Sequence, residues 1–228
     1  MTHLTLTCQC GACEIEVLDS SVRYRAECLC FDCRQRAMIS SGMGNRKAFP
    51  ESLANYSCGS DILYFANLLR VSEQTKAKLE FRKLRESGSN VTTYARCCGT
   101  IMLSAHPAYD GKSITVFPDN CRISQSLVDV PTNAYLFALD FPQEKFRELK
   151  MHGLIPAIFS GDESLDAVEL PKFMAAAQAA IDEIWLAQPH TTYEALYADV
   201  QIVVSDDLFA NSRQQYEWSA GASHRVTA

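Results

Sequence analysis

The sequence predicts a mainly β domain followed by a mostly helical segment, so that the chain is α+β overall. Short runs in which apolar and polar residues alternate, separated by turn signals, continue to about residue 140. Beyond that point the composition shifts to helical patterns. We therefore expect a β domain over residues 1–140 and a mostly helical extension with a flexible tail over residues 141–228.

The expected strands are short and lie between turns. Residues 4–17 contain two strands around Gly11, because apolar side chains alternate with threonine in the first strand and with acidic residues in the second. Residues 34–44 fit a short helix or a loop. Further strands are expected at residues 22–27, 63–69, 79–84, 91–96, 100–103 and 114–117.

Helical patterns dominate the C-terminal part of the chain. The longest helix is expected over residues 171–187, where Phe173, Ile181 and Trp185 lie on one face. Shorter helices are expected at residues 142–149 and 193–197. An apolar run then covers residues 200–204, and a flexible tail is expected from about Ser219.

Charge and hydropathy exclude several classes of partner. The 228 residues carry a formal net charge of -6, which gives no electrostatic reason to bind nucleic acid or an anionic membrane. No apolar stretch approaches the roughly 18 residues of a spanning helix, and the N-terminus lacks the basic and apolar blocks of a signal peptide. We expect a cytoplasmic protein without nucleic-acid or membrane partners. The sequence leaves the oligomeric state open, a homo-oligomer included.

The ten cysteines are the unusual feature of this composition. Most of them are grouped, as Cys8-Gln9-Cys10-Gly11, as Cys28-Leu29-Cys30-Phe31-Asp32-Cys33 and as Cys97-Cys98-Gly99. A reducing cytosol disfavours structural disulfides, so grouped cysteines there more often bind metal or carry out redox chemistry.

The spacing of these cysteines favours zinc. Zinc takes about four ligands in a tetrahedron, and Cys-x-Cys and Cys-x-x-Cys spacings allow one turn to present two sulfurs. Four protein ligands are typical of a structural zinc, whereas three with an open position are typical of a catalytic one. The sequence predicts one of each. Cys8 and Cys10, with a sulfur from near residue 98, would form the structural site, and Cys28, Cys30 and Cys33 the catalytic one.

Other interpretations apply to some of the cysteines. Cys58 and Cys121 are isolated in the sequence, and Cys13 alternates with apolar residues, so core packing is expected for all three. A dithiol redox role is the alternative for Cys30 and Cys33. Such motifs usually open a helix after a strand in a thioredoxin-like frame, which the sequence does not predict here.

Taken together, the motifs at residues 8–11, 28–34 and 98–99 resemble those of the glutathione-dependent formaldehyde-activating enzyme family, also called the CENP-V/GFA family. The resemblance covers roughly residues 5–118. It implies a β-tent fold of small antiparallel sheets around zinc. It also implies that the first motif contributes to a structural zinc and the second to a catalytic zinc.

The last motif departs from the family pattern of Cys-x-x-Cys-Gly. Cys98 matches its second cysteine, but the first would fall on Ala95. Cys97 is the favoured substitute as the fourth structural ligand, and Cys13 is the alternative.

The resemblance also implies an activity. Members similar to the founding enzyme promote the condensation of glutathione with formaldehyde, which implies a carbon–sulfur lyase-type enzyme that acts on thiol–aldehyde adducts. A small thiol such as glutathione would be the partner, and Arg34 could bind one of its carboxylates through a bidentate contact. The alternative is a non-catalytic zinc-binding scaffold or interaction module.

Overall fold

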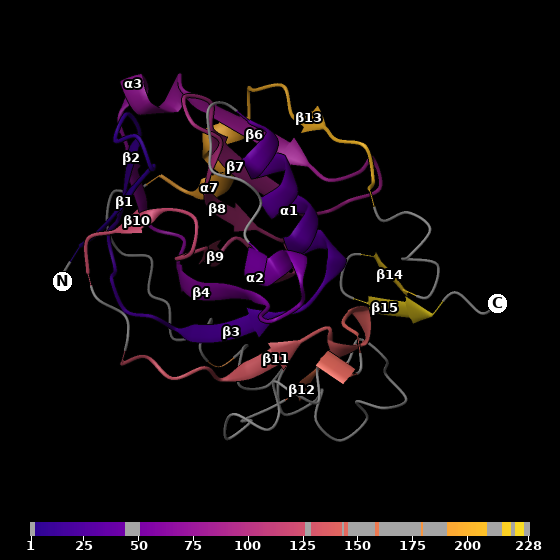
Figure 1. Cartoon of the computed structure of the whole chain (residues 1–228). Helices are drawn as coiled ribbons and strands as arrows, with labels where there is room; N and C mark the ends of the chain where they lie inside the picture. The colour runs from indigo at the N-terminus through magenta and orange to yellow at the C-terminus, as the bar shows by residue number, and fades with distance from the viewer. Residues whose placement is uncertain are drawn as a thin grey trace.

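The structure, a computed structural model, describes residues 3–43, 51–125, 129–142, 144–145, 158–159, 179, 191–208, 216–219 and 222–225. Its strands form a four-stranded sheet, a nine-stranded sheet and a separate two-stranded hairpin, with a few short helices (Figure 1). The prediction of a mainly β fold is confirmed.

The four-stranded sheet has the order β10-β1-β2-β5, and all neighbours are antiparallel. Leu4, Leu6, Ile15 and Val17 have no exposed surface, which confirms the alternation read from the sequence. Gly11, in the turn between β1 and β2, has φ +83°, a conformation that favours glycine. The strands are β1 (Leu4–Thr7), β2 (Glu14–Val17), β5 (Leu69–Val71) and β10 (Arg122–Ile123).

The nine-stranded sheet has the order β12-β11-β3-β4-β9-β8-β7-β6-β13. Its central strands are antiparallel, whereas β11 pairs in parallel with both β3 and β12, and β13 pairs in parallel with β6. The strands are β3 (Tyr24–Cys28), β4 (Ser60–Ala66), β6 (Leu79–Lys83), β7 (Val91–Ala95), β8 (Thr100–Ala105), β9 (Ser113–Val116), β11 (Ala134–Leu136), β12 (Ile158–Phe159) and β13 (Val203–Val204).

Helix α1 (Phe31–Gly42) follows β3 almost directly and covers most of residues 34–44, for which the sequence predicted a short helix or a loop. It begins inside the second cysteine motif, because the Cys30 side chain is the N-cap and accepts a hydrogen bond from the Cys33 backbone N–H at 3.3 Å. Other helical segments are α2 (Glu51–Ala54), α3 (Glu73–Lys76), η1 (Pro107–Tyr109), η2 (Ala138–Asp140) and α7 (Tyr193–Tyr197).

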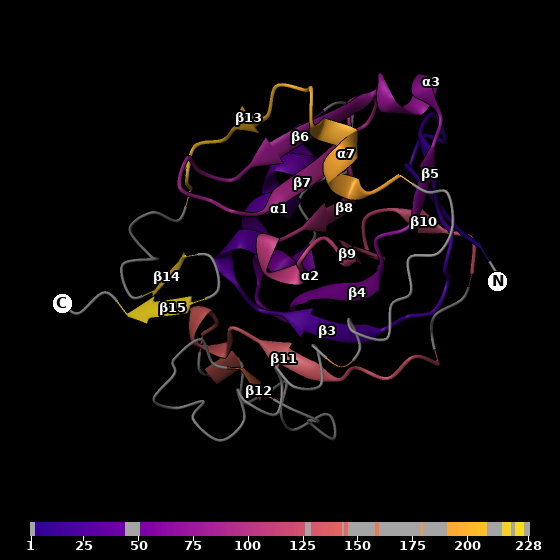
Figure 2. The ribbon, with the colours of Figure 1, turned by 180° about the vertical axis from the view of Figure 1, so that it is seen from behind.

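Helices α1 and α7 cover opposite faces of the nine-stranded sheet, as the two opposite views show (Figures 1 and 2). Successive side chains of β7 point to opposite faces. Thr92 accepts a hydrogen bond from Arg36 of α1 at 2.9 Å. The hydroxyl of the next residue, Thr93, lies 2.8 Å from that of Tyr193 of α7.

Residues after the composition shift complete the core of the β domain. Tyr193 and Leu196 are buried with the strands of both large sheets. The side chain of Asn67 holds α7 in place, because it accepts from the Tyr193 backbone N–H and donates to Glu194, both at 2.7 Å. The periodicity of residues 193–197 predicted this helix but not its place in the core.

Two other predictions for the C-terminal segment concern its tail and its longer helices. Strands β14 (Tyr216–Ser219) and β15 (Ala222–Arg225) pair in an antiparallel hairpin, and β15 lies within the tail that the sequence predicts to be flexible. The predicted helices at residues 142–149 and 171–187 lie largely outside the described residues.

Candidate metal centres

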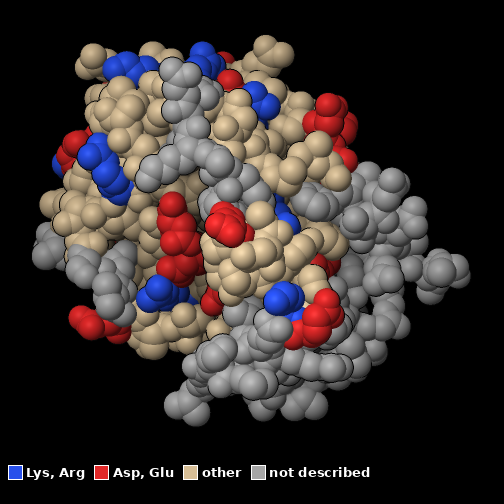
Figure 3. All heavy atoms as spheres, viewed as in Figure 1, with Lys and Arg blue, Asp and Glu red and all other residues tan. Residues whose placement is uncertain are grey.

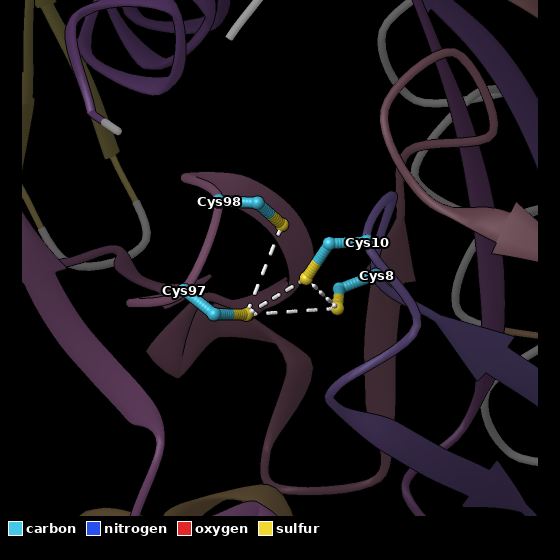
Figure 4. A group of neighbouring side chains, drawn as sticks. All are labelled: Cys8, Cys10, Cys97 and Cys98. Atoms are coloured by element: carbon cyan, nitrogen blue, oxygen red, sulfur yellow. Dashed lines mark hydrogen bonds between the residues drawn. The ribbon is translucent and has the colours of Figure 1, made fainter. Parts of the chain in front are cut away.

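Four cysteines from two distant turns form the first group, called here the four-cysteine cluster (Figure 4). Cys8 and Cys10 lie in the turn between β1 and β2, and Cys97 and Cys98 lie in the turn between β7 and β8. The four Sγ atoms all lie within 4.8 Å of one another. The cluster therefore joins the four-stranded sheet to the nine-stranded sheet.

The spacing of these sulfurs fits a tetrahedral metal ion. An ion with metal–sulfur distances of about 2.3 Å separates its sulfurs by about 3.8 Å. The observed Sγ–Sγ distances are 3.6 Å for Cys8 and Cys10, 3.8 Å for Cys8 and Cys97, and 3.9 Å for Cys97 and Cys98. Cys10 and Cys97 are closer, at 3.3 Å. The cluster could hold a metal ion with small adjustments of its side chains.

A glycine allows the neighbouring residues Cys97 and Cys98 to face the same point. Gly99 has φ +67°, and its N–H donates to the carbonyl of Ala95 at 2.7 Å, which closes the turn. A Cβ at this position would lie 2.6 Å from the Ser40 carbonyl oxygen of α1, closer than real Cβ contacts occur. Ser40 in turn donates to the Gly99 carbonyl at 2.6 Å. The end of α1 thus holds this turn in place.

A fifth sulfur lies next to the four-cysteine cluster. The Sγ of Cys13 is 3.8 Å from that of Cys97, and the Cys13 backbone N–H donates to the Cys8 sulfur at 3.2 Å. Burial raises the pKa of the Cys13 thiol to about 11. Burial also opposes the ionisation of Cys98, but hydrogen bonds from Thr100 and from Cys10 outweigh it and lower the pKa of Cys98 to about 6.

Cys28, Cys30 and Cys33 form the second group, called here the three-cysteine cluster. They lie at the end of β3, at the N-cap of α1 and in its first turn. The Sγ atoms of Cys28 and Cys30 are 3.2 Å apart, and that of Cys33 lies within 4.8 Å of both. All three side chains are largely buried. This group could also hold a metal ion.

Hydrogen bonds favour a thiolate at Cys33. Bonds from the thiols of Cys28 and Cys30 hold the pKa of Cys33 well below its usual range, against the effect of burial. Arg36, one helical turn further along α1, contributes in the same direction and donates to the Cys33 sulfur at 3.3 Å. The same thiol–thiol hydrogen bonds raise the pKa of Cys28.

The two clusters differ in the number of ligands they supply. Within the described residues, no further cysteine, histidine or carboxylate joins the three-cysteine cluster. Asp32, inside the motif, is turned toward Arg85 and forms an ion pair with it at 2.9 Å. The structure thus groups the seven cysteines that the sequence proposed as ligands into a set of four and a set of three.

The local geometry of Cys30 and Cys33 differs from the expectation. The sequence did not predict a helix opening at this motif, yet α1 begins there directly after a strand. The surroundings still differ from a plain dithiol site, because the third sulfur, of Cys28, is 3.2 Å from that of Cys30. The strand–helix junction typical of a dithiol redox motif is therefore present at Cys30 and Cys33. An experiment must distinguish a dithiol role of these two cysteines from metal binding.

Arg34, proposed from the sequence to bind a carboxylate, lies on α1 and is 8% exposed. Its guanidinium stacks 3.7 Å from the ring centre of Tyr56 and donates to the carbonyl of Leu53. These contacts direct it toward α2. Its role toward a carboxylate stays a prediction.

Sequence reasoning did not identify Arg36. A signal was present, because Arg36 stands three residues after Cys33 and would lie on the same face of a helix. This spacing places Arg36 beside Cys33 only if the segment is helical from residue 31, which the sequence did not predict. Cys58 is partly exposed and Cys121 is buried, and neither belongs to the two clusters.

The surface has a hollow of about 610 Å³, and none of the clustered cysteines lines it. Gln9, between Cys8 and Cys10, contributes to its lining, and so do the ion-paired Arg25 and Asp61.

The surface and the helices of the described residues give two further observations. On the face shown in Figure 3, acidic and basic side chains are interspersed. In the part of the chain that the structure describes, none of the helices has the length and apolar character needed to cross a bilayer.

Neither the models of known protein families, nor the curated proteins, nor the solved structures contain a match to this chain. The function is therefore inferred from the geometry of the two clusters.

Proposed function

We propose that the chain is a zinc-dependent enzyme that joins a thiol to an aldehyde and splits the adduct, a carbon–sulfur lyase-type activity. The observation that carries the proposal is the difference between four clustered sulfurs and three. Four ligands close a tetrahedral zinc, whereas three leave one position for an incoming group. We assign the structural zinc to the four-cysteine cluster and the reactive zinc to the three-cysteine cluster. The β-tent arrangement of the formaldehyde-activating family is part of the same proposal.

The residues present fit zinc. Both clusters consist of thiols, which are among the preferred ligands of zinc, and the sulfur spacing of the four-cysteine cluster is close to that of a tetrahedral site. Cys28, Cys30 and Cys33 would hold the zinc, which would supply a Lewis acid that lowers the pKa of a thiol or water bound to it.

The reaction needs few other groups. A thiol sulfur forms a bond to the carbonyl carbon, the carbonyl π electrons move to its oxygen, and the thiol proton ends on that oxygen. Glutathione and formaldehyde give S-(hydroxymethyl)glutathione in this way, and the reverse reaction releases both. The buried cluster contributes a site of low dielectric constant, in which hydrogen bonds to developing charge are stronger than in water.

The test is the rate of adduct formation from glutathione and formaldehyde, followed by NMR. We expect zinc-loaded protein to accelerate formation above the uncatalysed rate, and Cys30→Ser protein to have no effect on it. The matched control is Cys121→Ala, which removes a buried sulfur outside both clusters and should retain the acceleration. A wild-type protein that holds both zinc ions without acceleration, and loses them only on unfolding, would instead be a zinc-binding scaffold.

A further inference from the structure

Arg36 is a buried cation beside the three-cysteine cluster. Its side chain is on α1, and the residue is 4% exposed. Nε donates to Thr92 at 2.9 Å and Nη1 donates to the Cys33 sulfur at 3.3 Å. Nη2 lies 3.0 Å from the Asn90 side-chain oxygen when the amide is turned toward it. The guanidinium thus contacts two neutral side chains, those of Thr92 in β7 and Asn90 just before it, and the sulfur of Cys33.

A buried guanidinium needs a compensating negative charge, because it does not deprotonate in proteins and an unpaired buried charge is strongly unfavourable. Among the described residues, none of the ion pairs involves Arg36. The nearby carboxylate of Asp32 is paired with Arg85. The group in hydrogen-bond contact with Arg36 that can be an anion is the sulfur of Cys33.

We infer that Arg36 is the charge partner of the three-cysteine metal site, an inference that rests on the assignment of the reactive zinc to that cluster. Three thiolates and one divalent ion carry a net charge of -1, and Arg36 brings the buried site to zero. A neutral fourth ligand keeps it at zero. An incoming thiolate brings it to -1, whereas without Arg36 the same state would carry -2. Arg36 therefore favours both retention of the metal and entry of an anionic sulfur.

A second buried group is consistent with a small polar ligand at this place. Tyr94 lies two residues after Thr92 on the same face of β7 and packs in one apolar cluster with Cys28, Cys30 and Cys33. Its hydroxyl is buried and has no hydrogen-bond partner among the described atoms. A water or carbonyl oxygen bound in the cluster would supply one.

The alternative is that Arg36 only pins α1 to β7. A purely structural residue would weaken the fold and both metal sites together. A charge partner acts on the three-cysteine site in particular and depends on its positive charge. The metal affinity of each site separates the two roles without any assay of activity.

The experiment is a titration of the full chain with Co²⁺ against a competing chelator, followed by absorption of the cobalt–thiolate bands. The difference between wild-type and Cys30→Ser spectra defines the signal of the three-cysteine site, and the remaining signal reports the four-cysteine site. We expect Arg36→Gln to lower the affinity of the three-cysteine site about 10- to 100-fold, the usual effect of losing a group that supports a metal ligand. The four-cysteine site should keep its affinity.

Three further variants keep the test decisive if Arg36→Gln does not fold. Arg36→Lys retains the charge and should retain most of the affinity. Thr92→Val removes one anchor of the guanidinium and should have a smaller effect than Arg36→Gln. Arg34→Gln removes the other buried arginine of α1, which stacks on Tyr56, and should leave the three-cysteine affinity unchanged.

Several results would overturn the inference. These are unchanged affinity in a folded Arg36→Gln protein, an equal loss in Arg34→Gln, an equal loss in Arg36→Lys, or a wild-type three-cysteine site that binds no Co²⁺. The proposed lyase activity is tested separately. If adduct formation is not accelerated but the affinities behave as described, the assignment of Arg36 stands and the reaction is wrong.

Discussion

The two cysteine clusters use the same chemical group in opposite surroundings. The four-cysteine cluster joins two β-turns, and two of its members, Cys10 and Cys97, are exposed. The three-cysteine cluster lies at a strand–helix junction, is largely buried and contacts Arg36. Among the described residues, no arginine side chain donates to a sulfur of the four-cysteine cluster. Under the proposed assignment, the closed site lies partly at the surface and joins the two sheets, whereas the buried three-ligand site has Arg36 as its charge partner.

Helix α1 connects the two clusters. Cys30 caps its N-terminus, and Ser40 near its C-terminus donates to Gly99 beside Cys98. The step of ten residues from Cys30 to Ser40 corresponds to a rise of about 15 Å along the helix. Helix α1 therefore contacts both clusters, and metal binding is compared at both sites in each variant.

The largest expected effect comes from breaking the crosslink between the sheets. Cys8→Ser should remove the metal of the four-cysteine cluster and lower the free energy of unfolding by several kcal/mol, because binding of a structural zinc contributes directly to folding. Denaturant unfolding of zinc-loaded protein measures this. Cys121→Ala, also in the core, should cost only about 1 kcal/mol. Equal losses in the two variants would contradict the crosslink.

A smaller effect is expected at the turn that presents Cys97 and Cys98. Gly99→Ala places a Cβ 2.6 Å from the Ser40 carbonyl at a positive φ, so we expect a loss of about 1–3 kcal/mol and weaker metal binding at the four-cysteine cluster. Thermal unfolding and chelator competition measure both. Gly42→Ala, at the end of α1, meets nothing within 4 Å and should be neutral or slightly stabilising. If the two glycines respond alike, the turn is not strained as described.

Cys30 can be separated into a ligand and a helix cap. Serine is also a good N-cap, so Cys30→Ser should release the metal of the three-cysteine cluster while α1 stays capped. Cys30→Ala removes both functions and should unfold about 1 kcal/mol more easily than the serine variant in metal-free protein. Metal content and denaturant unfolding provide the two readouts. A metal content equal to that of wild type in both variants would remove Cys30 from the ligand set.

The smallest difference concerns the fifth sulfur. We expect Cys97→Ser to lower metal affinity at the four-cysteine cluster more than Cys13→Ser does, because the Cys97 sulfur belongs to the group of four within 4.8 Å of one another and the Cys13 sulfur does not. Chelator competition on the two variants measures this. The reverse order would make Cys13 the fourth ligand.

Much of the fold was predictable because it follows local alternation. The strands now seen as β1, β2, β6, β7 and β8 were expected within a few residues, since each has a buried face and lies between turns. The pairing of β11 in parallel with β3 was not predictable, because it joins residues more than 100 positions apart. The same applies to the docking of α7 through Asn67.

For the candidate sites, the grouping of sulfurs within each motif was predictable from spacing alone. Cys97 was the favoured fourth ligand, and the structure places its sulfur with that of Cys98. How two neighbouring cysteines do this was not predictable, because it depends on the left-handed conformation of Gly99 and on the end of α1. Arg36 was missed for a related reason. Its contact with Cys33 exists only because the helix begins at Cys30, and capping by a cysteine gives little signal in a sequence.

Zinc X-ray absorption of the purified protein, with and without glutathione, tests the central claim most directly. Sites with four and three sulfurs predict an average of about 3.5 sulfur ligands per zinc, which should rise to about 4 when the thiol enters the open position. An average of four before the thiol is added would contradict an open site. So would a disulfide between the sulfurs of the three-cysteine cluster, with zinc bound only by the other four.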